Sequence, residues 1–111
     1  MKLSELIEGA QLQLLTKAEY RDCDITGCYI GDLLSWVMGR AEPGNVWITI
    51  MSNINIAAVA SLTDCACVLL AEEGTPEQEV IDKADAQGLV LLRSSKTCYQ
   101  LAVELHRLTG L

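Results

Sequence analysis

Uncharged apolar runs and helix-period patterns alternate along the second half of the chain. Three short runs have the continuous apolar character of strands inside a parallel sheet, and a helical segment follows each of them. The strands are predicted at 46–50, 66–70 and 89–92, and the first helix at 54–62. The second helix is predicted to be capped by Thr75, with Pro76 at its first position. The third is predicted to be capped by Ser94 or Ser95 and to end before Gly110. This order predicts right-handed crossovers and a mainly parallel sheet.

The first half of the chain carries shorter patterns. Ser4 can cap a short helix, and residues 11–15 alternate as a half-buried strand does. Residues 25–30 indicate another strand, and a helix is expected from Gly31 to about Arg40. Its predicted core stripe is Leu33, Leu34, Val37, Met38 and Ala41. We therefore predict one α/β domain over 1–111, with three layers: a mainly parallel central sheet flanked by helices.

The charge and the apolar pattern of the chain argue against nucleic-acid and membrane partners. The sequence has 111 residues, with 15 acidic and 8 basic side chains and a net charge of -7. The basic residues are scattered, so binding to nucleic acid is disfavoured. Acidic residues interrupt the N-terminal apolar stretch, and no segment reaches the roughly 20 apolar residues of a membrane span. We expect a cytoplasmic protein without nucleic-acid or membrane partners.

The most specific pattern lies where a turn leads into the second predicted strand. Asp22, Thr26 and Gly27 occupy this turn. The pattern continues in Tyr29, 32–35, 37–38, 47–50, 55–56 and 58–60. Together these residues resemble the DRTGG-domain family, and the resemblance extends over nearly the whole chain.

Three positions depart from the family pattern. Cys23 stands where arginine is usual, Cys28 where the second glycine is usual, and Trp36 where the family commonly has an acid. A thiol cannot replace the five donors of a guanidinium, so any anion contact made by the family arginine is lost in this chain.

The resemblance implies a fold like that of the N-terminal domain of HPr kinase. Domains of this family occur beside adenine-nucleotide-sensing CBS domains in some pyrophosphatases, within some phosphate acetyltransferases, and as small stand-alone proteins. Some stand-alone members accompany iron-only hydrogenase components in anaerobes. The resemblance therefore implies a regulatory or assembly module, often dimeric, without an assigned activity of its own.

Five cysteines offer a second interpretation. Cys23, Cys28, Cys65 and Cys67 could in principle form a metal or iron–sulfur site, but their spacings are not those of paired C-x-x-C knuckles. If residues 65 and 67 begin a strand, they share one face of it. Reduced, packed thiols are the favoured interpretation, and no cofactor is expected.

Candidate ligand residues lie where predicted strands lead into helices. Parallel sheets bind ligands beyond the carboxyl ends of their strands. The candidates are Asn53 and Asn55 after the first of these strands, and Ser94, Ser95 and Lys96 after the third, with Asp22, Thr26 and Gly27 from the family-like turn. The third junction has hydroxyls and two cations, which favour a small anion or an adenine nucleotide. The alternative is that these side chains only cap helices.

Trp36 is the candidate interface residue. It lies on the helical face opposite the predicted core stripe and shares that face with Asp32. An outward tryptophan is typical of interface anchors, so we expect a homodimer or a protein partner at this face.

No motif in the chain indicates catalysis. His106 is the only histidine and lies on the outer side of the last helix, and phosphate-loop and hydrolase motifs are absent. The leading hypothesis is a non-catalytic regulatory or assembly module, homodimeric, that binds a protein partner and a small anionic or nucleotide ligand. The alternatives are a cysteine-dependent metal or iron–sulfur accessory protein of anaerobic redox enzymes, and a small enzyme with an unrecognised site.

Overall fold

A five-stranded sheet forms the centre of the computed structural model, which describes all residues from 1 to 111. The strand order is β1-β5-β4-β3-β2. The strands are β1 (Gln13–Leu14), β2 (Gly27–Ile30), β3 (Asn45–Thr49), β4 (Cys67–Leu70) and β5 (Leu91–Arg93). Strands β2 to β5 are mutually parallel, and only β1 is antiparallel to its neighbour β5. The predicted α/β class with a mainly parallel sheet is confirmed.

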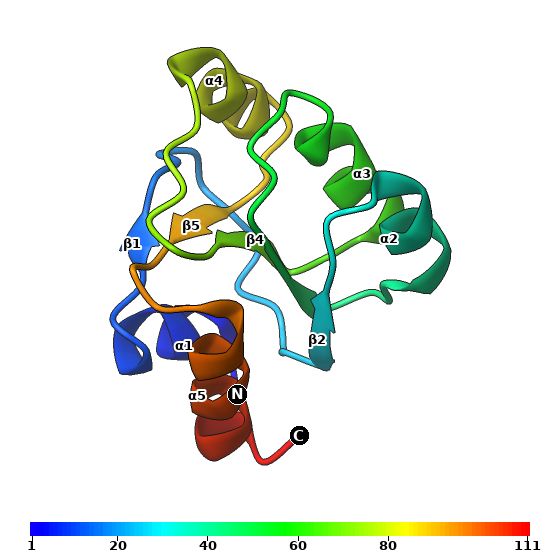
Figure 1. Ribbon diagram of the computed structural model, residues 1–111. Helices are drawn as coiled ribbons and strands as arrows, with labels where there is room; N and C mark the ends of the chain where they lie inside the picture. The colour runs from blue at the N-terminus through cyan, green and yellow to red at the C-terminus, as the bar shows by residue number, and fades with distance from the viewer.

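Helices cover both faces of this sheet (Figure 1). One layer contains α2 (Leu34–Arg40), α3 (Ile56–Thr63) and α4 (Gln78–Ala86), and the other contains α1 (Leu3–Gly9) and α5 (Cys98–Thr109). Each crossover from β2 to β5 moves one strand along the sheet in the same direction, so right-handed connections place α2, α3 and α4 on one face. None of the five helices combines the length and the apolar character that crossing a membrane requires.

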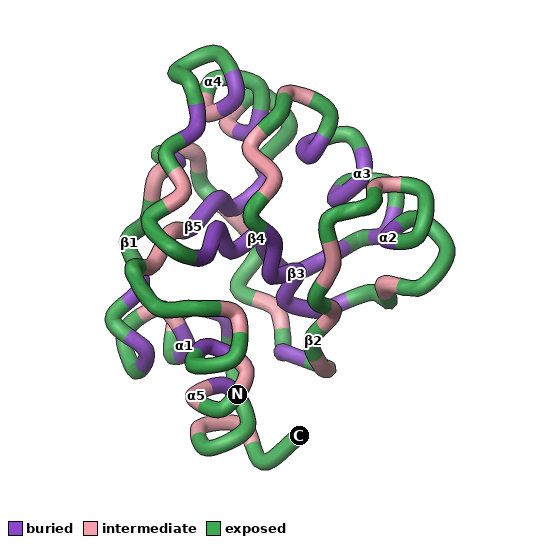
Figure 2. Tube along the Cα trace, in the orientation of Figure 1, coloured by how far each residue is buried: buried purple, intermediate pink, exposed green.

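Two hydrophobic cores fill the space between the layers. One, of 15 buried residues, lies under α1 and α5, and the other, of 13, lies under α2, α3 and α4. Figure 2 shows the buried segments concentrated in the central strands. Trp47 is fully buried, and its indole N–H donates to the Gly31 carbonyl at 2.8 Å. The chain contains no phenylalanine, and its cores are filled mainly by branched aliphatic side chains and by the indole of Trp47.

Several helix starts differ from the prediction. Ser4 does not cap α1 but lies inside it, and its hydroxyl donates to the Asp22 carboxylate. The residue that precedes α4 is Glu77, not Thr75, whose hydroxyl donates to the Glu73 carbonyl. Thr97, not Ser94 or Ser95, caps α5 in a reciprocal capping box with Gln100. The bond that occupies the Ser4 hydroxyl is long-range, whereas the bonds of Thr75 and Thr97 are made with residues two or three positions away.

The predicted core stripe of α2 is partly wrong. Val37 is fully buried, but Leu33 and Met38 are 60% and 52% exposed. The helix begins only at Leu34 and has seven residues. It is therefore too short to bury more than about one turn against the sheet and α3. Apolar side chains at its margins are left at the surface.

Candidate functional site

The connections after β4 and β5 leave the sheet in opposite directions. Strand β4 continues toward α4 on one face, and its neighbour β5 continues toward α5 on the other. Such a divergence at the carboxyl ends of adjacent parallel strands is where α/β sheets commonly bind ligands. Here the two loops are joined by backbone bonds: the Glu72 N–H donates to the Lys96 carbonyl at 2.9 Å, and the Glu73 N–H to the Ser94 carbonyl at 2.8 Å.

Both glutamates in this loop have left-handed backbone conformations. Their φ angles are 56° for Glu72 and 60° for Glu73. This region is disfavoured for residues with a Cβ atom, and such conformations persist where the surroundings hold them. The two bonds to the β5–α5 loop are the contacts that hold them here.

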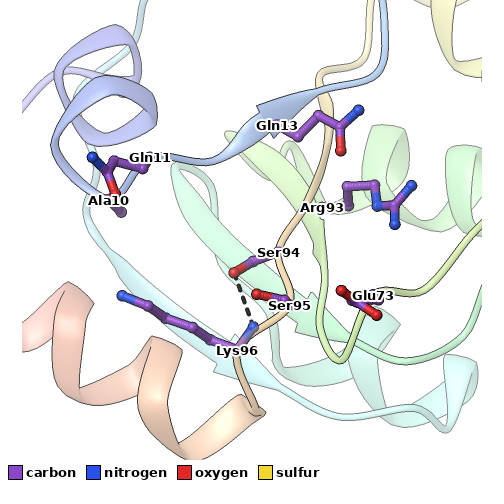
Figure 3. A pocket seen from close by; sticks show the side chains of 8 residues that line it. All are labelled: Ala10, Gln11, Gln13, Glu73, Arg93, Ser94, Ser95 and Lys96. Atoms are coloured by element: carbon purple, nitrogen blue, oxygen red, sulfur yellow. Dashed lines mark hydrogen bonds between the residues drawn. The ribbon is translucent and has the colours of Figure 1, made fainter.

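A polar pocket of about 290 Å³ lies beside the bonded loops (Figure 3). Its wall on one side is the end of α1 and strand β1, and on the other side the loop that follows β5. The lining residues are Ala10, Gln11, Gln13, Glu73, Arg93, Ser94, Ser95 and Lys96. Because β1 pairs with β5 in the register Gln13 to Arg93, the amide of Gln13 and the guanidinium of Arg93 come to one edge.

The pocket has two cationic side chains and one carboxylate among its lining residues. Figure 3 shows Lys96 extending toward Gln11 and Arg93 extending the other way, toward the side of the pocket where Glu73 lies. Neither cation forms an ion pair within the chain, whereas Lys2, Arg21 and Arg107 do. Two cations against one carboxylate, with hydroxyl and amide groups between them, can bind an anion through charge-assisted hydrogen bonds.

The structure brings three of the predicted ligand residues together. Ser94, Ser95 and Lys96 line the same pocket, and the Ser94 hydroxyl also accepts a bond from the Lys96 N–H at 3.2 Å. Sequence reasoning missed Gln11, Gln13 and Glu73. No sequence signal could have supplied Gln11 and Gln13, because the pairing of β1 with β5 joins segments at opposite ends of the chain. Glu73 comes from the loop after β4, which is bonded to the loop after β5.

Asn53 lies at a different pocket. That pocket, of about 570 Å³, is between the β3–α3 loop and the start of α4, with Glu77 and Glu79 at its α4 side. The Asn53 side chain accepts a bond from the Asn55 N–H at 2.7 Å, and Asn55 is not among the lining residues. The first and third predicted junctions therefore do not form one site.

The family-like turn lies at the opposite, amino end of the sheet. The Asp22 carboxylate accepts bonds from the Ser4 hydroxyl at 2.6 Å and the Ser4 N–H at 2.8 Å, and these two bonds lower the pKa of Asp22. The Thr26 hydroxyl donates to the Pro43 carbonyl at 2.7 Å and accepts from the Asn45 amide at 3.2 Å. Gly27, at the start of β2, borders a third pocket. The polar side chains of this turn are thus bonded within the chain.

Asp32 and Trp36 lie near the carboxyl end of β2. The Asp32 carboxylate accepts bonds from the Thr49 hydroxyl at 2.7 Å and the Ile50 N–H at 3.0 Å, so it joins the β2–α2 loop to the end of β3. Trp36 is 55% exposed, and the guanidinium of Arg40 lies 3.8 Å from the centre of its ring. This geometry is a cation–π contact on the outer side of α2.

A solved structure with this arrangement of strands and helices comes from the regulatory region of an enzyme. It contains the CBS and DRTGG domains of the regulatory region of Clostridium perfringens pyrophosphatase, complexed with its activator, diadenosine tetraphosphate. The TM-score is 0.76 at 12% sequence identity, over 93% of this chain and 45% of that one. The predicted resemblance to the DRTGG-domain family is confirmed in the fold. The chain spans less than half of that regulatory region. No protein-family model and no curated protein matches the sequence.

Four of the five cysteines pack in or against the two cores of this DRTGG-like fold, and Cys28 is exposed. Cys65 packs under α2, α3 and α4, while Cys67 packs under α1 and α5. The prediction that they share a face is wrong, because β4 begins only at Cys67. Burial raises the pKa of the Cys28 thiol to about 11 and also raises the pKa values of Cys67 and Cys98. The chain brings no three His, Cys, Asp or Glu side chains together in a metal-binding arrangement.

Proposed function

We propose that this chain is a non-catalytic, cytoplasmic regulatory module, homodimeric, that binds a small phosphate-bearing ligand and acts on a protein partner. The observation that carries the proposal is the pocket in which Arg93 and Lys96, both without an ion-pair partner, flank Ser94 and Ser95. The fold supports a regulatory role, because the structurally similar C. perfringens protein is a regulatory region.

The size and polarity of the pocket favour the phosphate part of a ligand. Its volume of about 290 Å³ is at the lower limit for a small-molecule site, and Ala10 is its only apolar lining residue. Because Arg93 and Lys96 extend in opposite directions, different phosphates of one ligand would accept bonds from the Arg93 fork and from the Lys96 ammonium, with the serine hydroxyls between them. A nucleoside attached to the phosphate would extend onto the surface around the pocket. The phosphate-rich activator of the C. perfringens protein is consistent with this class of ligand.

The bonded loops give ligand binding a route to the rest of the molecule. A ligand held by Ser94 and Lys96 contacts the segment that leads directly into α5. The same segment receives the backbone bonds of Glu72 and Glu73. Binding is therefore expected to order both loops and the start of α5, a change that a protein partner or second subunit can detect.

The remaining candidate contacts stay predictions. Asn53 borders the larger pocket and can contact the uncharged part of a ligand there. For Asp22, Thr26 and Gly27, a ligand would have to compete with bonds already made within the chain. Trp36, exposed on α2, is proposed as a contact for the protein partner.

Isothermal titration calorimetry tests the ligand site directly. Wild-type protein is titrated with ATP, AMP, diadenosine tetraphosphate and inorganic phosphate, and the same titrations are made with R93Q/K96Q. We expect binding of at least one phosphate compound, weakened at least tenfold in the double variant. Lys83→Gln is the matched control, because Lys83 is an exposed cation on α4 that does not line the pocket.

The thermal stabilities of the variants separate binding from folding. Neither Arg93 nor Lys96 makes an ion pair, so the double variant should unfold within about 0.5 kcal/mol of wild type. A wild-type protein that binds none of these compounds, or a double variant that binds them as well as K83Q does, would contradict the proposed site.

A further inference from the structure

Arg93 and Lys96 belong to two different parts of the polar pocket. Figure 3 shows the Lys96 side chain extending toward Gln11, whereas Arg93 extends to the other side. The backbone of Arg93 is fixed at the end of β5, between β1 and β4. The backbone of Lys96 is fixed by the loop, because its N–H donates to the Ser94 hydroxyl at 3.2 Å and its carbonyl accepts from the Glu72 N–H at 2.9 Å. We call these two parts the arginine half and the lysine half.

The two halves differ in net charge. The arginine half contains the Gln13 amide and the carboxylate of Glu73, which is the only carboxylate that lines the pocket. The guanidinium of Arg93 and this carboxylate balance each other, so the arginine half is neutral overall. The lysine half contains the Lys96 ammonium and the uncharged amide of Gln11, and it is therefore cationic.

A carboxylate on α5 does not cancel the charge of the lysine half. Glu104 is paired with Arg107, whose guanidinium lies 2.7 Å from the carboxylate, and it does not line the pocket. The hydrogen bond from Arg107 and, less strongly, the charge of Lys96 lower the pKa of Glu104. Because Arg107 already balances Glu104, the Lys96 ammonium remains available to an anion.

Two serines connect the halves. Ser94 and Ser95 lie between the two cations (Figure 3). The Ser94 hydroxyl accepts a bond from the Lys96 N–H, which leaves its own proton free to donate. Neither the hydroxyl nor the N–H of Ser95 is bonded within the chain. The pocket therefore has a row of free donors from one half to the other.

The charge difference distinguishes the two kinds of phosphate in a polyphosphate chain. A terminal phosphate carries a charge of about -1.5 to -2 at pH 7, because its second pKa is about 6. An internal phosphate has no second ionisable hydroxyl and carries less charge. The Glu73 carboxylate repels the more highly charged terminal group, and the unpaired Lys96 attracts it. The planar fork of Arg93 matches two oxygens of an internal phosphate.

We propose that the pocket binds a linear polyphosphate chain in one direction, with its terminal phosphate at Lys96 and an internal phosphate at Arg93. A nucleoside attached to the chain leaves the pocket from the arginine half, beside Gln13. A compound with a single phosphate, such as inorganic phosphate, occupies the lysine half alone. This inference rests on the phosphate site of the proposed function, and it adds the ligand class and the direction in which the ligand lies.

Single variants test the two halves by calorimetry in metal-free buffer, with inorganic phosphate and tripolyphosphate as probes. Lys96→Gln should weaken the binding of both probes about tenfold or more, which is the scale of one charge-assisted hydrogen bond. Arg93→Gln should weaken tripolyphosphate about as much, but should change the binding of inorganic phosphate by less than about twofold. Lys83→Gln, outside the pocket, should change neither, and circular dichroism checks that each variant is folded.

Glu73→Gln tests the physical reason for the direction. Without this carboxylate the arginine half becomes cationic and can also accept a terminal phosphate. The variant E73Q/K96Q should therefore recover the binding of inorganic phosphate to within about threefold of wild type, whereas K96Q alone should not. Gln retains the side-chain size of Glu, so the exchange removes the charge and leaves the shape of the pocket.

Phosphorus-31 NMR of ATP reads the direction itself, because the terminal and internal phosphates give separate resonances. Binding to wild type should shift both kinds of resonance. Lys96→Gln should abolish mainly the shift of the terminal resonance, and Arg93→Gln mainly that of an internal one. Arg93→Lys, which keeps the charge without the fork, should restore only part of the internal shift. Diadenosine tetraphosphate, whose chain is capped at both ends, should bind more weakly than ATP.

The contrary outcomes separate this inference from the proposed function. If R93Q and K96Q weaken inorganic phosphate equally, both cations hold one phosphate, and the inference fails while the phosphate site stands. A terminal resonance that responds to R93Q and not to K96Q reverses the direction, and E73Q/K96Q that binds as weakly as K96Q removes its cause; each overturns the inference alone. A wild-type protein that binds no phosphate compound overturns both.

Discussion

The two ends of the parallel sheet use their polar side chains differently. At the amino end, Asp22 and Thr26 each make two hydrogen bonds within the chain, and Asn45 is buried beside them. At the carboxyl end, Arg93 and Lys96 border an open pocket and make no ion pair. Both ends contain residues that sequence reasoning selected as ligand contacts.

The difference separates groups that hold the fold from groups that are free to bind. A polar side chain already bonded inside the protein must break those bonds before it contacts a ligand. A cation exposed in a pocket without a partner loses only water. Changes at the amino end should therefore alter stability, and changes at the carboxyl end should alter binding.

The largest expected effect is at Gly44, which lies against Thr26. Its φ is +82°, and a Cβ atom there would lie 2.7 Å from the Thr26 methyl and 2.8 Å from the Thr26 hydroxyl. Gly44→Ala should reduce the free energy of unfolding by about 2–4 kcal/mol, because it adds a steric clash to the left-handed conformation. Gly88→Ala is the control: its φ is +67° with no neighbour within 4 Å, so about 1 kcal/mol is expected. Equal losses in chemical denaturation would show that the Thr26 contact is unimportant.

A smaller effect is expected at Asp22, and it should depend on pH. Its bonds to Ser4 lower its pKa in the folded state, so the carboxylate stabilises the fold above the ordinary aspartate pKa of about 3.9. That contribution is lost as the pH falls through the lowered pKa. Asp22→Asn should therefore melt below wild type at pH 7, by less than Gly44→Ala does, and the two melting temperatures should converge in acid. A constant difference down to pH 2 would exclude this linkage.

The smallest effect on stability, with a distinct effect on binding, is expected at the two left-handed glutamates. Glu72→Gly and Glu73→Gly both relieve the same backbone conformation, and each should change the free energy of unfolding by less than about 1 kcal/mol. Only Glu73 lines the pocket, so removing its carboxylate should strengthen binding of phosphate compounds about two- to tenfold. Calorimetry that finds the same gain for Glu72→Gly would place the effect in the loop and not in the pocket.

The sequence predicted the order of elements because each has a strong local signal. The uncharged runs of β3 and β4 and the spacing of Leu101 and Leu105 correspond to buried positions in the structure. It failed where several weak signals compete, as among Ser94, Ser95 and Thr97 for the cap of α5. It also failed where burial depends on distant neighbours, as at Leu33 and Met38.

The candidate site was predictable only in part for the same reason. Ser94, Ser95 and Lys96 are adjacent in the chain and precede a helix, so a local argument finds them. Gln11 and Gln13 reach the pocket through the pairing of β1 with β5, which no local pattern encodes.

The pairing of β1 with β5 also determines at which stage of synthesis and folding the pocket can form. Gln13 and its partner Arg93 are 80 positions apart (93 minus 13), so the pocket walls come from nearly opposite ends of the chain. During synthesis the N-terminal wall must wait until β5 has emerged, and the pairing closes one of the longest loops in the domain. The pocket is therefore complete only in a fully folded molecule, and a ligand bound in it would select that state over every partly folded one.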